Sequence, residues 1–285
     1  MAGTLFLVAT PIGNLGDVTL RALETLRSVP VVVAEDTRRT RTLLSHFQIT
    51  GKTLISCDAH ASPSTLAGLV ERLERGEDIA LVTDAGTPSV SDPGAALVQA
   101  AAASAVAIVP IPGVSAVTTA VAASGLVDGA FSFLGFPPRQ GGKRREFLDR
   151  VARAEHPVVI FEAPHRVDRT LADLAALAPE RRAVLCRELT KLHEEIRRGT
   201  LAELAALGEA VRGEVTLVLA AAEAAPALDL EAQRPELESE IEQRLRAGAS
   251  PRSVVDELAS VVELPRREIY RVVTEIASRL AAEPP

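Results

Sequence analysis

The amino-acid sequence predicts an α/β protein made of two successive α/β domains and a small helical domain. Short runs of Val, Ile and Leu alternate with longer segments of helical periodicity, which is typical of βα units around a parallel or mixed sheet. The length of 285 residues exceeds that of one average domain. Beyond residue 220 the strand-like runs stop and the pattern becomes helical, which indicates a separate C-terminal unit.

The first α/β domain is expected to cover residues 1–112. Amphipathic segments at residues 20–26 and 66–73 predict helices between the strands. The strands are predicted at residues 5–9, 31–34, 53–56, 79–83 and 106–111. A Pro-Gly pair, Pro112 and Gly113, marks the end of this domain.

The second α/β domain is expected to cover residues 113–222. It begins with a predicted helix at residues 115–124, and its strands are predicted at residues 131–134, 158–161, 184–187 and 215–220. The Ala, Pro, Glu and Asp content of residues 223–235 predicts a linker. Residues 236–285 are predicted to form three short helices. This tail suits either a helix-turn-helix-like RNA-binding module or a dimerisation or packing element, and its acidic residues outnumber its basic ones.

The overall charge argues against non-specific binding to nucleic acid. The formal net charge is −7, the isoelectric point is near 5.4, and aromatic residues make up only 3% of the chain, so a platform of stacked bases is not expected. Basic residues nevertheless gather locally. The candidates for RNA contacts are Arg38, Arg39, Arg41, Lys143, Arg144 and Arg145. Solvated helix faces explain the same clusters equally well.

Several other classes of protein are disfavoured. The two cysteines, Cys57 and Cys186, lack the spacing of a metal site or redox pair, so we expect buried reduced thiols, no metal and a cytoplasmic location. The first apolar run ends at Pro11, which disfavours a signal peptide. The uncharged stretch of residues 93–127 is interrupted by prolines, which disfavours a membrane span. No P-loop, dinucleotide-binding glycine motif or zincin motif is present.

Polar turns follow many of the predicted strands. These turns are TPIGNLGD at residues 10–17, EDTRRT at 35–40, DAGTP at 84–88, PIPGVSA at 110–116, EAPHR at 162–166 and RELTK at 187–191. Each of them alone is an ordinary turn. Because ligands bind outside the carboxyl ends of strands in open α/β sheets, we expect these turns to converge on one site.

Taken together and in this order, the same motifs resemble the 16S rRNA (cytidine-2′-O)-methyltransferase branch of the tetrapyrrole methylase superfamily. The resemblance runs from residue 5 to about residue 220 and continues more weakly through the tail. It implies two α/β domains with S-adenosylmethionine in the cleft between them, commonly in a homodimer. It also implies methyl transfer to the ribose 2′-hydroxyl of a decoding-centre cytidine in the small ribosomal subunit.

The resemblance also implies a set of cofactor contacts, some of them through the backbone. These are Ile12, Thr83, Asp84, Ala85, Gly86, Thr87, Val114, Ser115, Ala116, Glu162, Leu189 and Val215. The Asp84 carboxylate can bind the ammonium or a ribose hydroxyl of the cofactor, and Gly86 lets the backbone approach it. The alternative is that Asp84 caps the helix entered through residues 92–94.

The sequence departs from the superfamily pattern at two places. The first turn reads V-A-T-P-I-G-N, whereas members that act on tetrapyrroles usually carry V-G-x-G-P-G, and this points to the ribosomal branch. After the third predicted strand the chain reads C-D-A-H-A-S-P, so His60 lacks the Asn and Glu neighbours expected in that branch. No catalytic role is assigned to His60.

A ribose hydroxyl is a poor nucleophile at neutral pH, so transfer needs in-line placement and either a base or a stabilising cation. Lys191 is the first candidate, as a neutral base or as a charged stabiliser, with Glu188 beside it; an ordinary ion pair is the alternative for Lys191. Further candidates are Glu35, Asp36 and His165. Two rival functions stay open: a precorrin-type methylase of the same fold, and a non-catalytic ribosome-binding factor.

Overall fold

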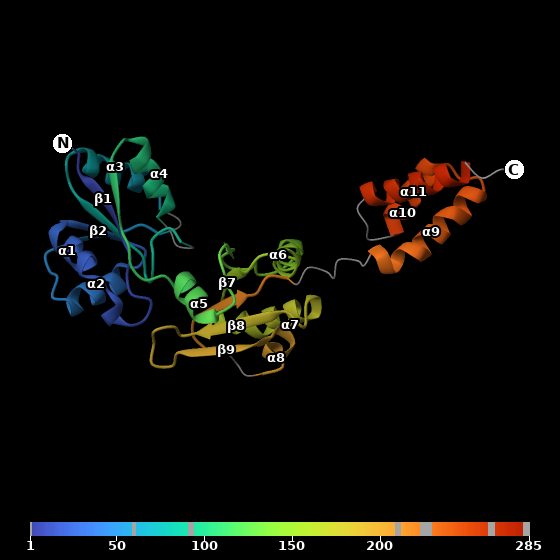
Figure 1. Ribbon diagram of the computed structural model, residues 1–285. Helices are drawn as coiled ribbons and strands as arrows, with labels where there is room; N and C mark the ends of the chain where they lie inside the picture. The colour runs from blue at the N-terminus through green and yellow to red at the C-terminus, as the bar shows by residue number, and fades with distance from the viewer. Residues whose placement is uncertain are drawn as a thin grey trace. The chain divides into compact units, whose positions relative to one another are not determined.

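The computed structural model describes residues 2–58, 61–90, 94–208, 212–222, 230–261 and 266–281 (Figure 1). His60 lies outside this range. The chain divides into two compact units, Met1–Ala222 and Glu223–Pro285. The larger unit holds two five-stranded sheets that follow one another along the chain.

The first sheet is entirely parallel, with the strand order β3-β2-β4-β1-β5. Its strands are β1 (Thr4–Val8), β2 (Val31–Ala34), β3 (Thr53–Ser56), β4 (Ile79–Val82) and β5 (Ala107–Ile111). The central strands β2 and β4 are buried at every residue, because each is an unbroken aliphatic run covered on both faces. Since all five strands are parallel, their carboxyl ends meet at one edge of the sheet.

Two pairs of helices cover the faces of this sheet. Leu26 of α1 (Leu20–Ser28) and Leu44 of α2 (Thr37–His46) pack on one face, while α3 (Pro63–Glu74) and α4 (Ala95–Ala103) pack on the other. The start of α2 is fixed by Asp36, whose carboxylate accepts a hydrogen bond from the Arg38 N–H at 2.8 Å. Because of this cap, the Arg-rich first turn of α2 follows directly after β2.

The second sheet is mixed, with the strand order β6-β7-β10-β8-β9. Its strands are β6 (Ser132–Phe133), β7 (Val158–Glu162), β8 (Arg182–Arg187), β9 (Glu195–Thr200) and β10 (Val215–Leu219). Strand β9 is absent from the predicted strands. Its sequence, EIRRGT, lacks an apolar run because β9 is a partly exposed edge strand that pairs only with β8.

One face of the second sheet carries α6 (Gly142–Ala152), α7 (Val167–Leu177) and the short α8 (Leu201–Ala205), packed on a common apolar core. The other face is covered by α5 (Ala116–Ser124). Val117 and Ala120 of α5 share an apolar cluster with Val159 and Val184 of the sheet, and Ile12 of the first turn belongs to the same cluster. This cluster therefore connects the first turn of the chain to the second sheet. Cys57 and Cys186 are both buried and free, as predicted.

The smaller unit consists of α9 (Leu230–Arg246), α10 (Pro251–Val261) and α11 (Arg266–Ala281), with Ile241, Val254, Leu258, Ile269 and Val273 in its core. Helix α9 starts at Leu230, so the helical part begins earlier than the predicted end of the linker at residue 235. Pro235 lies inside the helix, where it removes one backbone hydrogen bond without ending the helix. None of the described helices is long and apolar enough to cross a membrane.

The α/β class and the added helical domain predicted from the sequence are confirmed by this architecture. The polar turns after β1, β2 and β4 lie at the carboxyl edge of the first sheet.

Candidate active site

The turn after β1 and the turn after β4 are joined by backbone hydrogen bonds. The Thr10 N–H donates to the Gly86 carbonyl at 2.8 Å, and the Gly86 N–H donates back to the Thr10 carbonyl at 3.0 Å. The Thr10 hydroxyl also donates to the Thr83 carbonyl at 3.0 Å. Gly86 has a φ of +86°, a backbone conformation that strains any L side chain. The two turns therefore form one rigid platform.

Asp84 connects this platform to the turn after β2. Its carboxylate accepts a hydrogen bond from the Asp36 N–H at 3.1 Å and lies 3.4 Å from Nη1 of Arg39. The side chain keeps 22% of its surface exposed. Among the described residues the partners of the Asp84 carboxylate are Asp36 and Arg39, at the turn after β2 and the start of α2, whereas the N-cap residue of α4 is Gly94; these contacts favour a role of Asp84 at the turns over capping of α4.

A cavity of about 410 Å³, here called the larger cavity, opens beside Asp84. Its walls come from the Asp84 turn, the first residues of α5, the end of β7 and the start of β10. Most of the residues predicted to contact the cofactor line it, namely Ile12, Asp84, Ala85, Gly86, Thr87, Ser115, Ala116, Glu162 and Val215. The structure thus gathers turns that are far apart in the sequence around a single space. Phe136 and Phe161 add an aromatic wall, with ring centroids 5.4 Å apart.

The start of α5 leaves backbone donors at this cavity. Ser115 is the N-cap residue of α5, and its side chain forms no capping hydrogen bond. The first N–H groups of a helix have no acceptor within the helix and carry a partial positive charge. Ser115 and Ala116 line the larger cavity, so this helix end suits a carboxylate.

The other predicted cofactor residues do not line the larger cavity. Thr83 lines a second cavity described below. The Val114 carbonyl accepts a hydrogen bond from the Thr87 hydroxyl at 3.3 Å, which fixes the turn. Leu189 is only 7% exposed and packs with Ile12 in the apolar cluster under α5.

Glu162 has a structural role that its motif did not predict. Its carboxylate is fully buried and accepts hydrogen bonds from the Ala163 N–H at 2.7 Å, Nε of Arg166 at 2.7 Å and the Thr170 hydroxyl at 2.6 Å. Nη1 of Arg144 lies 3.9 Å away. Because the lone pairs of this carboxylate already meet these donors, the side chain supports the cavity wall and is not available to a ligand.

Arg144 must therefore be removed from the predicted RNA contacts. Its side chain is only 4% exposed, and its guanidinium donates to Asp173 and to the Thr170 hydroxyl, each at 2.9 Å. Position 144 faces the core of the second sheet, whereas Lys143 and Arg145 on either side of it are exposed. The three residues differ in exposure because successive side chains on a helix point about 100° apart, so only one of them faces the sheet.

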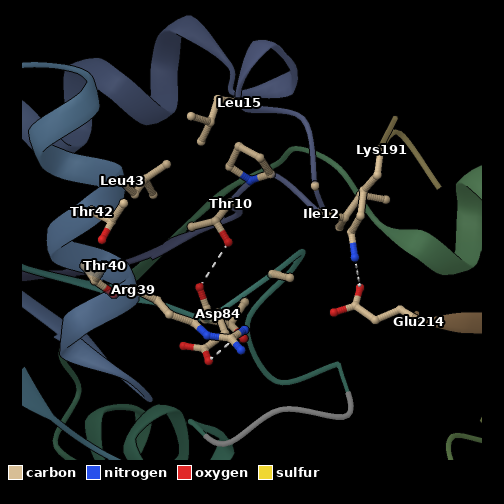
Figure 2. Close-up of a pocket in the computed structure, with 14 residues that line it drawn as sticks. Thr10, Ile12, Leu15, Arg39, Thr40, Thr42, Leu43, Asp84, Lys191 and Glu214 are labelled. Atoms are coloured by element: carbon tan, nitrogen blue, oxygen red, sulfur yellow. Dashed lines mark hydrogen bonds and ion pairs between the residues drawn. The ribbon is translucent and has the colours of Figure 1, made fainter. Parts of the chain in front are cut away.

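A second cavity of about 340 Å³, here called the smaller cavity, lies next to the larger one (Figure 2). Its walls are the turn after β1, one face of α2, the Thr83–Ala85 turn and Lys191. The residues that line both cavities are Ile12, Arg39, Asp84, Ala85 and Glu214, and these form a shared wall. The buried Thr83 hydroxyl finds no hydrogen-bond partner among the described residues.

Lys191 lies at this shared wall, and Figure 2 shows its ammonium directed toward Glu214. Nζ is 2.8 Å from Oε1 of Glu188 and 3.2 Å from Oε2 of Glu214. Partial burial alone would lower the pKa of Lys191, but the two carboxylates outweigh it and raise the pKa above its ordinary value. The raised pKa keeps Lys191 charged at neutral pH in this structure, which disfavours the neutral base; the charged stabiliser and the ordinary ion pair with Glu188 and Glu214 both fit the geometry.

The position of Lys191 depends on two glycines. A Cβ on Gly13 would lie 2.3 Å from Cγ of Lys191, so the lysine crosses the first turn where only a glycine leaves room. Glu188 lies against Gly213 and accepts from the Glu214 N–H at 2.9 Å, while the hydrogen bond from Lys191 lowers the pKa of Glu188. Glu188 lines neither cavity, so it orients Lys191 through their ion pair without facing a ligand itself.

Of the remaining acid-base candidates, only Glu35 lines one of the two cavities. Glu35 lines the larger cavity. Asp36 caps α2, and its hydrogen bonds with Arg38 hold its pKa far below the usual range, so it does not serve as a base near neutral pH. His165 is exposed and lines neither cavity.

The exposed arginines of α2 lie beside the cavities. Arg38 is 86% exposed and pairs with Asp36 at 2.8 Å, Arg39 is 66% exposed, and Arg41 is exposed as well. Lys143 and Arg145 lie on α6 and line neither the larger nor the smaller cavity.

Several site residues went unnoticed in the sequence. Thr42 and Leu43 look like ordinary helix residues, and Phe136 and Phe161 look like core. Glu214 precedes β10, which pairs antiparallel with β8, and this pairing brings it opposite the RELTK turn. A strand register was therefore the only signal that could have found Glu214.

Comparison with known proteins agrees with this arrangement. The family model described as tetrapyrrole (corrin/porphyrin) methylases matches residues 4–205. The chain belongs to the tetrapyrrole methylase family. Within that family, the chain is 42% identical over 279 residues to ribosomal RNA small subunit methyltransferase I of Synechocystis sp., covering 96% of this chain and 98% of the relative. The protein of the same name from Micromonospora olivasterospora is 43% identical over 285 residues, covering 99% and 88%.

The likeness of the motifs to the ribosomal branch is therefore confirmed. Solved structures share the fold at lower identity. The methyltransferase CobJ has a TM-score of 0.59 and 19% identity, covering 78% of this chain and 95% of that one. Uroporphyrin-III C-methyltransferase from Thermus thermophilus, solved with S-adenosyl homocysteine, has a TM-score of 0.54 and 20% identity, covering 76% and 97%.

Proposed function

We propose that this chain transfers a methyl group from S-adenosylmethionine to the ribose 2′-hydroxyl of a decoding-centre cytidine in 16S rRNA of the small ribosomal subunit. The observation that carries the proposal is the larger cavity, where nine of the predicted cofactor residues meet next to a charged lysine. The names of the relatives, ribosomal RNA small subunit methyltransferase I, support rRNA as the substrate. The cytidine 2′-oxygen follows from the resemblance of the motifs.

The larger cavity suits the chemistry of S-adenosylmethionine. The free backbone donors at the start of α5 suit its carboxylate, the Asp84 carboxylate suits its ammonium or a ribose hydroxyl, and Phe161 and Phe136 offer an apolar wall for its adenine. Gly86 allows close approach of the backbone. When bound, the cofactor supplies an electrophilic methyl group on a sulfonium.

The role of the protein is then to place and stabilise the acceptor hydroxyl, whose proton would pass to water or to a carboxylate at the larger cavity such as Glu35 as the oxygen takes the methyl group. A charged group close to the place where an alkoxide develops lowers the barrier by electrostatic stabilisation. Lys191 fits that role because Glu188 and Glu214 keep it charged and hold it at the wall shared by the two cavities.

The exposed arginines of α2 are proposed to contact RNA phosphates, together with Lys143 and Arg145 on α6. Arg41→Ala is the cleanest test, because Arg39 is paired with Asp84 of the larger cavity. We expect Arg38→Ala and Arg41→Ala to weaken binding of the small subunit and to leave the affinity for S-adenosylmethionine unchanged. Equal subunit binding by variants and parent would remove these residues from the RNA surface.

The experiment that tests the function is transfer of a tritiated methyl group to small ribosomal subunits that lack ribose methylation, with a precorrin-type macrocycle as a parallel acceptor. Label on one cytidine that makes the adjacent phosphodiester resistant to alkali supports the proposal. Label on a base or on the macrocycle contradicts it. No label together with no calorimetric binding of S-adenosylmethionine favours a non-catalytic ribosome-binding factor.

The resemblance further implies a homodimer, and the buried reduced cysteines favour a cytoplasmic location. Light scattering after size-exclusion chromatography and cell fractionation test these two predictions. A monomer at micromolar concentration would contradict the first of them.

A further inference from the structure

The smaller cavity lies next to the larger cavity without being part of it. Thr10, Gly13, Leu15, Thr42, Leu43 and Lys191 line only the smaller one, and the shared wall separates it from the α5 side. Methyl transfer needs donor and acceptor atoms about 3–3.5 Å apart, so two ligands must meet at a common boundary. A pair of cavities with one wall in common provides such a boundary.

We propose that the smaller cavity receives the acceptor nucleoside after it turns out of the RNA fold, so that its ribose reaches the shared wall beside Lys191. This inference rests on the proposed function and deepens it by naming the compartment that holds the substrate. Enzymes that modify a nucleotide inside a folded nucleic acid commonly extrude it into a fitted pocket.

The volume of the smaller cavity fits a single nucleoside. At about 340 Å³ it lies near the lower end of the range of roughly 300–1,000 Å³ for small-ligand sites. A macrocycle of four pyrrole rings needs a larger space. The size of the cavity therefore favours a nucleoside over the substrates of the tetrapyrrole-modifying members.

The lining has the chemistry that a pyrimidine nucleoside requires. Leu15 of the first turn and Leu43 of α2 provide aliphatic contacts for the faces of a base, and the Thr42 hydroxyl lies on the same wall of α2 (Figure 2). The buried Thr83 hydroxyl has no partner among the described residues, and leaving such a group unsatisfied costs free energy.

The charges at the cavity are balanced. Arg39 is paired with Asp84, and Lys191 is paired with Glu214, as the dashed lines in Figure 2 show. An uncharged base and ribose can therefore enter without leaving a carboxylate or a cation unpaired inside. Arg39 is 66% exposed and lines the cavity, so it is accessible to the phosphates of an extruded nucleotide.

The test fills the cavity from two different elements. Thr42→Trp acts from the exposed face of α2, and Leu15→Trp acts from the first turn, where Leu15 is 38% exposed. Ser45→Trp is the matched control, because Ser45 is exposed on the same helix and lines neither cavity. Circular dichroism first confirms that each variant has the helix content and melting temperature of the parent.

We expect both filling variants to lower kcat/KM for the small subunit by about 30-fold or more, with the affinity for S-adenosylmethionine within about twofold of the parent and with Ser45→Trp unchanged. Normal transfer by a folded filling variant overturns the inference. Loss of cofactor affinity by the same factor as transfer also overturns it, because the smaller cavity would then belong to the cofactor site.

A binding measurement separates this inference from the proposed function. Equilibrium dialysis of labelled cytidine monophosphate against protein saturated with S-adenosyl homocysteine reports on the smaller cavity without any transfer. If the parent does not methylate subunits but binds the nucleotide and the filling variants do not, the proposed function fails and the cavity assignment stands. Suppose that the parent does not methylate subunits, and that the nucleotide either does not bind or binds the parent and the filling variants equally. Then both the proposed function and the cavity assignment fail.

Discussion

Replacing Glu162 by Gln tests the conclusion that this residue is a structural support and not a ligand contact. Glu162 is fully buried between Arg144, which is 4% exposed, and Arg166, which is 16% exposed. Removing one partner from a buried ion pair typically costs about 3–5 kcal/mol, since the remaining charge stays buried without compensation. Arg144 keeps Asp173 as a partner and Arg166 reaches some solvent, so we expect a loss at the lower end, about 3 kcal/mol.

The measurement is the unfolding of the Met1–Ala222 unit by calorimetry and by urea. In a domain of this size, each kcal/mol shifts the melting temperature by about 2–4 °C, so Glu162→Gln should lower it by roughly 6–12 °C. Asp173→Asn is the control, because Asp173 contacts the same Arg144 with a side chain that is 39% exposed. That variant should lose no more than about 1 kcal/mol.

Coupling within the network provides a second criterion. Arg144→Met combined with Glu162→Gln should cost less than the sum of the two single changes, because the two side chains belong to one network and the interaction between them is lost only once. A loss below about 1 kcal/mol for Glu162→Gln, or additive losses in the double variant, would refute the account of Glu162 as a buried support.

Three further predictions follow from other parts of the molecule. Lys191→Met should lower kcat by about 10²–10³-fold with little change in cofactor affinity. Because the pKa of Lys191 is raised, the contribution of Lys191 to kcat should not change between about pH 6 and 9. A change of kcat with pH in this range that is present in the parent and absent in Lys191→Met would contradict the charged role. Burial raises the pKa of Cys186 from 9.0 to about 11, so as the pH rises the thiol ionises in the unfolded chain before it does so in the folded one. The free energy of unfolding, measured by urea titration, should therefore fall by on the order of 2 kcal/mol between about pH 9 and about pH 11. Cys186→Ala should show a smaller fall over the same pH range. A peptide covering residues 223–285 should unfold cooperatively by circular dichroism, since its helices bury a core of their own; a gradual melt would contradict this.

Much of the fold was visible in the sequence. Strands such as β2 and β4 are unbroken aliphatic runs because both of their faces are buried, and their polar turns mark where they end. Strand β9 was not predicted because this partly exposed edge strand, with two arginines, has no apolar pattern. The predicted linker ends too late because the Ala, Pro, Glu and Asp content of residues 223–235 indicates no helix, although α9 contains Pro235 at the cost of a hydrogen bond.

The site was only partly predictable, for a physical reason. Motif resemblance identifies which turns converge, but it does not tell which side chain points into the cavity and which points away from it. Glu162 and Arg144 are examples, since the motifs suggested a cofactor contact and an RNA contact. Both side chains instead belong to one buried network of ion pairs and hydrogen bonds. Glu214 shows the opposite case, because only the pairing of β10 with β8 brings it to Lys191.

The ion pairs around the cavities bear on how an acidic protein handles RNA. Arg38, Arg39 and Lys191 already have carboxylates of the chain as counterions, in place of mobile ions from solution. A phosphate that binds Arg38 or Arg39 must therefore displace a fixed Asp, and fewer dissolved ions are released than for a bare arginine. Binding of RNA should consequently respond to salt less steeply than the number of arginines at the interface would suggest. The freed carboxylates would also repel the phosphates, so these built-in counterions lower the affinity for RNA below that of bare arginines.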